Sequence, residues 1–103
     1  MLDHLTRETF ADEAYIRDIP VLVCFGAERC PHCVAQFKAL DSVAELVGDL
    51  SKIYLVNPDD QPELAALFGV TRIPSTVKIR NGMVEEMAVG LMPSEDILAM
   101  LKR

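Results

Sequence analysis

Two apolar runs in the first half of the chain have the pattern of strands that are buried on both faces. Residues 19–25 are rich in β-branched side chains and nearly uninterrupted in apolar character, with Pro20 near the start and Gly26 after the end. Residues 52–56 form a second run of this kind. Strands that helices cover on both faces show this pattern, whereas strands with one solvated face alternate. The sequence therefore predicts two central strands.

Apolar residues that recur at steps of three and four predict the helices. Between residues 34 and 47 this spacing persists until Gly48, which indicates a long amphipathic helix with a glycine stop. A short helix capped by the hydroxyl of Thr6 is expected near the amino terminus, and another is expected to begin at Pro62. Residues 93–96 predict a cap and the start of a last helix.

The second half of the chain contains a hairpin signal. Asn81-Gly82 separates the predicted strands 76–80 and 83–89, and this dipeptide favours a two-residue hairpin turn. The alternation of helix and strand before it favours parallel pairing through right-handed crossovers. We therefore predict one α/β domain over residues 1–103, with a central mixed sheet of about four strands and helices on both faces.

Composition narrows the class of protein. The chain has 103 residues, half of them hydrophobic, and a net charge of −6. Three cysteines are too few for the disulfide framework of a small secreted domain. The acidic balance argues against nucleic acid or an anionic membrane as a partner. The sequence shows neither a secretory signal pattern nor an apolar run of about 20 residues, so we expect a soluble cytoplasmic protein that binds no membrane.

The candidate chemistry lies in a close pair of cysteines, Cys30 and Cys33, which only Pro31 and His32 separate. The pair falls where the first predicted strand meets the long helix, the end of the sheet at which open α/β folds place their sites. Unpaired N–H groups and a partial positive charge at a helix amino terminus favour a thiolate. We expect an exposed, reactive Cys30, and a Cys33 that lies one turn deeper within bonding reach.

Three neighbours are expected to modulate Cys30. Pro31 suits the first helical position, because it needs no N–H there. His32 can supply positive charge or donate a hydrogen bond to the Cys30 sulfur, and Arg29 adds a permanent cation. All three effects favour the thiolate of Cys30.

Three interpretations of the pair compete: disulfide exchange, metal binding, and a redox-inert interaction module. A structural zinc site needs four ligands, and the chain offers only three further candidates, Cys24, His4 and His32. A zinc site within one chain is therefore disfavoured, whereas a metal-bridged dimer through the pair stays open. The position after a buried strand in a βαβ context favours disulfide exchange, which requires no cofactor.

Two longer stretches then carry a resemblance. Residues 21–33 match the strand, loop and helix start around the active site of the thioredoxin family, and residues 68–76 match the stretch that holds its cis-proline. Asn81-Gly82 and Val89-Gly90 fall at the distances expected for the family. The chain thus resembles thioredoxins over nearly its whole length, which implies the thioredoxin fold.

The resemblance also implies the activity and the site. It implies a thiol–disulfide oxidoreductase in which Cys30 is the nucleophile and Cys33 the resolving thiol, with a cis bond between Ile73 and Pro74. Protein disulfides would be the substrates, a thioredoxin-reductase-like protein the electron donor, and the chain a monomer. Ile73 would pair its backbone with an extended substrate segment. The expected substrate-binding residues are Arg72, Ile73, Pro74, Gly90 and Leu91, and the expected cationic rim of the site is Arg29, His32 and Arg72.

The sequence departs from the family at several positions. Gly26 and Arg29 stand where the family commonly has indoles, and Cys24 stands where it usually keeps a buried aspartate that moves protons to and from the resolving thiol. We expect Cys24 to be a small buried hydrophobe. Lys52 is near the position of the lysine that often accompanies that aspartate, but its register is not fixed by the sequence.

The dipeptide Pro31-His32 is the last departure, because it replaces Gly-Pro and resembles the bacterial periplasmic disulfide oxidases. Stabilising the Cys30 thiolate stabilises the reduced protein and makes its disulfide a stronger oxidant. We therefore expect a Cys30 pKa below about 7 and a potential less reducing than that of an ordinary thioredoxin.

Overall fold

Five strands form one mixed sheet in the computed structural model, which describes residues 2–103. They are β1 (Asp3–His4), β2 (Val21–Phe25), β3 (Lys52–Val56), β4 (Ser75–Arg80) and β5 (Met83–Val89). The order across the sheet is β1-β3-β2-β4-β5. The first three of these run parallel, β4 is antiparallel to β2, and β5 is antiparallel to β4. The predicted mixed sheet is confirmed, with one strand more than the sequence indicated.

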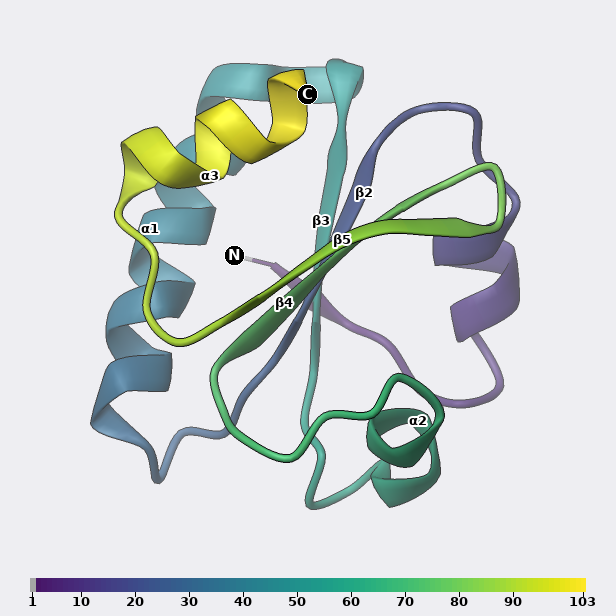
Figure 1. Cartoon of the computed structure of the whole chain (residues 1–103), viewed down its shortest axis with the longest axis vertical. Coiled ribbons are helices and arrows are strands. Elements are labelled where there is room, and N and C mark those ends of the chain that lie inside the picture. Colours follow the sequence, from purple (N-terminus) through teal and green to yellow (C-terminus); the bar gives the residue numbers. More distant parts are fainter. Residues whose placement is uncertain (1) are drawn as a thin grey trace.

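Helices cover both faces of this sheet, as predicted. They are the α-helices α1 (Pro31–Val47), α2 (Pro62–Leu67) and α3 (Ser94–Lys102), the short π-helical segment η1 (Ala11–Tyr15) and the 3₁₀ turn η2 (Gly48–Leu50). Figure 1 shows α1 and α3 together on one face of the sheet, with α2 and η1 on the other. A parallel βαβ unit needs such coverage, because its strands bury both faces.

The position of β2 at the centre of the sheet explains why its sequence is uninterrupted in apolar character. All five of its side chains are fully buried. Val21, Val23 and Phe25 belong to the core under α2 and η1, whereas Leu22 and Cys24 belong to the core under α1 and α3. Since alternate residues of a strand point to opposite faces, both sets must be apolar in a strand that is covered twice.

The amino-terminal segment differs from the prediction. Asp3 and His4 form β1, which pairs in parallel with Tyr54 and Leu55 of β3. This strand is two exposed polar residues long, so no apolar pattern marks it. The helix begins later than expected, and the Thr6 hydroxyl lies 3.3 Å from the hydroxyl of Thr9 instead of capping η1.

The hairpin follows the turn chemistry predicted from Asn81-Gly82. Asn81 has φ = +52° and Gly82 has φ = +73°, which a type I′ turn requires at both central positions. At the other end of the chain, the predicted side-chain cap of α3 is absent. Pro93 precedes the helix and its carbonyl accepts the N–H of Ile97 at 3.2 Å, while the acidic residues Glu95 and Asp96 lie in the first turn.

Candidate active site

Cys30 lies where the carboxyl end of β2 leads into α1, and it is the residue that caps this helix. Its backbone is extended (φ −105°, ψ 112°), and its Sγ accepts a hydrogen bond from the backbone N–H of Cys33 at 3.3 Å. Pro31 is the first helical residue. The side chain of Cys30 is partly exposed and that of Cys33 is fully buried. The two thiols therefore lie close together with very different access to solvent.

The surroundings of the two thiols move their pKa values apart. The pKa of Cys30 lies below its ordinary value of 9.0, mainly because the Cys33 thiol donates a hydrogen bond to it. Partial burial opposes this shift, while the backbone N–H groups of Cys33 and His32 add to it. Burial, followed by the hydrogen bond with Cys30, raises the pKa of Cys33 to about 11. The site thus favours one accessible thiolate beside one neutral, sheltered thiol.

The raised pKa of Cys33 predicts how the stability of the reduced protein changes at alkaline pH. A raised pKa stabilises the folded state fully below pH 9.0, and this stabilisation is lost as the pH rises toward about 11 for Cys33. The free energy of unfolding should therefore fall more across this interval in the reduced protein than in the oxidised protein, where Cys33 has no proton to lose. Urea unfolding of both forms at several pH values measures this difference.

A titration of thiolate absorbance at 240 nm tests the lowered pKa of Cys30. One thiol should ionise below the ordinary range, and a Cys30→Ser variant should lose that step. A profile in which no thiol ionises below its ordinary pKa would contradict the prediction.

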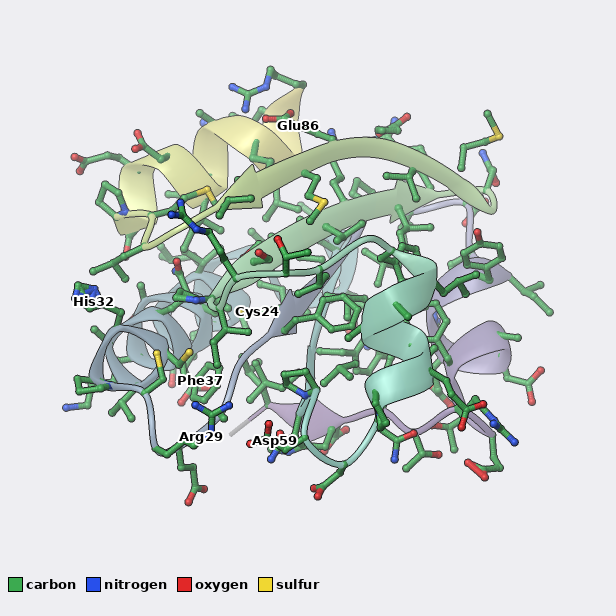
Figure 2. The ribbon with its side chains drawn as sticks, turned by 60° about the horizontal axis from the view of Figure 1, so that its bottom comes forward. Cys24, Arg29, His32, Phe37, Asp59 and Glu86 are labelled. Atoms are coloured by element: carbon green, nitrogen blue, oxygen red, sulfur yellow. The ribbon has the colours of Figure 1, made fainter. Side chains whose placement is uncertain are left out.

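Arg29 and His32 contribute less to this thiolate than the sequence indicated. The Arg29 guanidinium donates two hydrogen bonds to the carboxylate of Asp59, at 2.9 and 3.0 Å, so that this carboxylate offsets its charge. Arg29 gives the smallest of the effects that lower the pKa of Cys30. Figure 2 shows Arg29 beside Asp59, with His32 on the opposite side of the site and pointing outward. Within residues 2–103, the imidazole of His32 makes no hydrogen bond, and only its backbone N–H acts on Cys30.

Cys24 is a buried neutral thiol, in agreement with its expected role as a small hydrophobe. It is fully buried, and burial raises its pKa to about 12. Thr76 is its partner on the neighbouring strand. The Thr76 hydroxyl lies near enough to oppose this shift, but it is not aligned for a hydrogen bond, and its Oγ1 is buried without a partner among the described residues.

No lysine of the described chain accompanies Cys24 in the way the family's lysine accompanies its aspartate. Lys52 lies at the start of β3, opposite Val21, and its ammonium group approaches Asp49. The buried lysine of the sheet is instead Lys78, whose Nζ donates a hydrogen bond to the Arg103 carbonyl oxygen at 3.0 Å. Neither ammonium group is engaged with Cys24.

Gly26 follows β2 and has the ring of Phe37 packed directly over it. A Cβ at this position would lie 2.9 Å from two ring atoms of Phe37 and 3.1 Å from the Sγ of Cys33. Both distances are shorter than ordinary van der Waals contacts. The Phe37 ring therefore occupies the space next to Gly26, where the family commonly has an indole, and glycine is required for this close approach.

We expect Gly26→Ala to destabilise the protein by about 1–3 kcal/mol, because the added methyl group pushes both the Phe37 ring and the Cys33 sulfur away from position 26. Urea unfolding measures this loss. Phe37→Ala in the Gly26→Ala background removes the clash with the ring, though not the contact with Cys33, and should make the cost of the alanine smaller than in the parent. An equal cost in both backgrounds would rule out the ring contact as its cause.

The predicted substrate-binding residues meet beside the thiols. A groove of about 420 Å³ is lined by His32, Arg72, Ile73, Pro74, Val89, Gly90 and Leu91. The Ile73–Pro74 bond is cis, as the resemblance implied. Gly90 donates its backbone N–H to the carbonyl of Pro74 at 2.8 Å, which joins the two loops that form the groove. Arg29 lies outside this groove, so only Arg72 and His32 of the three residues expected at its rim line it.

Several residues that shape the site were not identified from the sequence. Asp59 pairs with Arg29 across 30 positions, and no local pattern marks such a pair. Phe37 falls within the apolar spacing of residues 34–47, which indicates only a position on the helix face toward the core. Gln36 did carry a signal, because a polar residue three positions after Cys33 and four before Leu40 falls on the buried stripe of α1.

Neither a metal-ligand cluster nor a membrane span is present in residues 2–103. No group of three or more His, Cys, Asp or Glu side chains is arranged to hold a metal ion within this part of the chain. None of its helices has the length and hydropathy of a membrane span.

Disulfide exchange needs an accessible thiolate and a second thiol that stays protonated until the first has reacted. Cys30 and Cys33 have these properties at the end of a central strand. His32, which lies between them in the sequence, lines one groove together with the cis-proline loop. This combination of fold and site defines the class of small dithiol–disulfide oxidoreductases.

Comparison with known proteins gives the family. The model of the thioredoxin family matches residues 1–103, and the chain belongs to this family. A thioredoxin of Rickettsia prowazekii is 28% identical over 98 residues, which cover 95% of this chain and 93% of the relative. Thioredoxin 1 of Nostoc is 30% identical over 99 residues, with 96% and 92% covered. Thioredoxin 1 of Synechococcus elongatus is 33% identical over 89 residues, with 86% and 83% covered. The chain is accordingly a thiol–disulfide oxidoreductase.

Proposed function

We propose that this protein exchanges its dithiol with disulfides of protein substrates, with Cys30 as the nucleophile and Cys33 as the resolving thiol. The observation that supports these roles is the opposite displacement of the two pKa values, downward for Cys30 and upward for Cys33. A nucleophile must be ionised and accessible, whereas a resolving thiol must wait until a mixed disulfide has formed.

The proposed reaction has two displacements. The Cys30 thiolate attacks one sulfur of the partner disulfide, which forms a mixed disulfide and expels the other partner sulfur as a thiolate. Cys33 then loses its proton and attacks the Cys30 sulfur, which releases the second partner sulfur. Two electrons pass to the partner, whose two sulfurs leave as thiolates and take their protons from the solvent, and the Cys30–Cys33 disulfide forms. Cys24 is neutral and buried at the place of the family's aspartate, so water accepts the proton of Cys33 in this proposal.

The groove beside the thiols is the proposed binding site for an extended substrate segment. Within residues 2–103, the backbone N–H and carbonyl of Ile73 make no hydrogen bond, so both are available to pair with another chain. Pro74, Gly90 and Leu91 supply the walls. Arg72 adds a positive charge to this lining, which favours acidic or neutral segments over basic ones.

The lowered pKa of Cys30 also sets the proposed direction of the redox potential. Stabilising the thiolate stabilises the reduced form, and each 1.4 kcal/mol of that preference raises the potential by about 30 mV. We expect a potential less reducing than that of a thioredoxin without this stabilisation. Equilibration with reduced and oxidised glutathione measures it, and a more negative value than that of such a thioredoxin would contradict the proposal.

The proposed setting is a reducing compartment such as the cytoplasm, where a thioredoxin-reductase-like donor returns electrons to the Cys30–Cys33 disulfide. The proposed working form is a monomer. Gel filtration together with metal analysis tests it, because a metal-bridged dimer through the cysteine pair would elute at twice the mass and carry metal.

Reduction of insulin disulfides tests the proposed substrate class. We expect the reduced protein to cleave insulin disulfides in a reaction that Cys30→Ser abolishes. A protein that leaves insulin intact but binds partners independently of its redox state would be the redox-inert interaction module.

A further inference from the structure

Gln36 is a fully buried polar side chain on α1, and both ends of its amide bond to one residue far away in the sequence. Its Nε2 donates a hydrogen bond to the carbonyl oxygen of Met92 at 3.1 Å. Its Oε1 accepts the backbone N–H of Met92 at 2.7 Å. The side chain has no exposed surface. The amide therefore pairs with the Met92 backbone as a neighbouring strand would, across 56 positions of the sequence.

This contact joins the helix that carries the thiols to the loop that lines the groove. Gln36 lies one turn after Cys33 on α1, and Met92 follows Gly90 and Leu91 directly. Gly90 in turn donates its N–H to the carbonyl of Pro74 at 2.8 Å. Hydrogen bonds at the two ends of residues 90–92 thus link this short segment to the thiol-bearing helix on one side and to the cis-proline loop on the other.

An apolar residue would fill this position in the core more simply. The surroundings of Gln36 on its stripe are Cys33 and Leu40, both fully buried. Burying an amide loses its hydration, and the two hydrogen bonds to Met92 compensate for that loss. Such a buried pair fixes the position of the loop relative to the helix more than it stabilises the fold, because both hydrogen bonds form in only one arrangement of the two.

We propose that Gln36 is a positioning residue that fixes the groove relative to Cys30, so that a bound protein disulfide lies in line with the thiolate. The inference rests on the proposed function, because it concerns the binding of a protein substrate in that groove. A groove that is already held in its binding arrangement binds a segment more tightly, because no binding energy is lost in selecting that arrangement from others.

The test compares two substrates in single-turnover reactions of the reduced protein. Insulin requires the groove, whereas 5,5′-dithiobis(2-nitrobenzoate) has no peptide backbone to bind there. Gln36→Met keeps the length and volume of the side chain but removes both hydrogen bonds. We expect its half-saturating insulin concentration to rise about tenfold, from the loss of two hydrogen bonds, while its rate with the aromatic disulfide stays within about twofold.

Three controls separate positioning from general damage. Amide hydrogen exchange at Met92 should accelerate in Gln36→Met. Gln36→Glu should give an intermediate half-saturating concentration, because its carboxyl keeps an acceptor for Met92 and, when protonated, also a donor. Val43→Ala removes core volume from the same helix seven residues beyond Gln36 and leaves both hydrogen bonds to Met92 in place, so its half-saturating insulin concentration should match that of the parent.

The outcomes distinguish the two levels of the proposal. If the parent reduces both substrates and Gln36→Met has a parental half-saturating insulin concentration, the positioning role is overturned and the proposed function stands. If Val43→Ala shows the same tenfold rise, the effect is general destabilisation and the positioning role is again overturned. If the parent reduces the aromatic disulfide but not insulin, the proposed protein substrate fails, and the role of Gln36 fails with it.

Discussion

Replacing Cys30 with serine is expected to reduce disulfide cleavage to the uncatalysed rate, whereas replacing Cys33 with serine is expected to stop the reaction halfway. The difference follows from the geometry of the pair. The partly exposed Sγ of Cys30 accepts hydrogen bonds at the start of α1, while Cys33 is fully buried beneath it. A serine hydroxyl at position 30 is not ionised at neutral pH and cannot form a mixed disulfide.

The intermediate provides the measurement. Cys33→Ser should accumulate a mixed disulfide between Cys30 and the partner, visible by mass spectrometry and on a non-reducing gel, and a thiol reagent should release it. Cys30→Ser should show no adduct, which makes it the matched control. An adduct formed equally well by Cys30→Ser would assign the attack to Cys33 and contradict the proposed roles.

Replacing Cys24 with aspartate is expected to destabilise the protein by about 3–5 kcal/mol relative to Cys24→Ser at neutral to alkaline pH. The carboxylate would be buried at a position with no exposed surface and no facing cation among the described residues. The buried lysine on this side of the sheet, Lys78, is engaged with the Arg103 carbonyl oxygen and with Glu85. Only the Thr76 hydroxyl, which has no partner within residues 2–103, could donate to the new group.

The pH dependence identifies the cause. Burial raises the pKa of a carboxyl group, so the folded state tolerates the neutral acid and loses stability as the pH rises through that raised pKa. Urea unfolding at about pH 5 and about pH 8 should therefore show a larger deficit at the higher pH, while Cys24→Ser shows no such trend. A deficit of the Cys24→Asp variant that is equal at both pH values would show that charge burial is not its source.

Local patterns were sufficient for most of the fold. The double coverage of β2 is encoded in five consecutive apolar residues, and the hairpin is encoded in Asn81-Gly82, where both residues take positive φ. The strand β1 could not be predicted in this way, because Asp3 and His4 are exposed and only their backbones pair with β3. The prediction of a mixed sheet was correct, and it had one strand too few because β1 carries no apolar pattern.

The site was predictable only as far as single residues carry its chemistry. The spacing of Cys30 and Cys33 and their position after a buried strand predicted where they lie, and the cis bond at Pro74 came from the resemblance alone. The charge balance of Arg29 depends on Asp59, which is 30 positions away in the sequence. The orientation of the groove depends on Gln36 and Met92, a pair that only the folded chain brings together.

The packing of Phe37 over Gly26 has a spectroscopic consequence. The chain contains no tryptophan, so the change in indole emission that commonly reports the redox state of such a site is absent from this protein. A phenyl ring lies against Gly26 instead, next to the Sγ of Cys33. The ring current of Phe37 should therefore shift the NMR signals of Cys33 by a different amount once the disulfide forms, and this change offers an intrinsic probe of electron transfer.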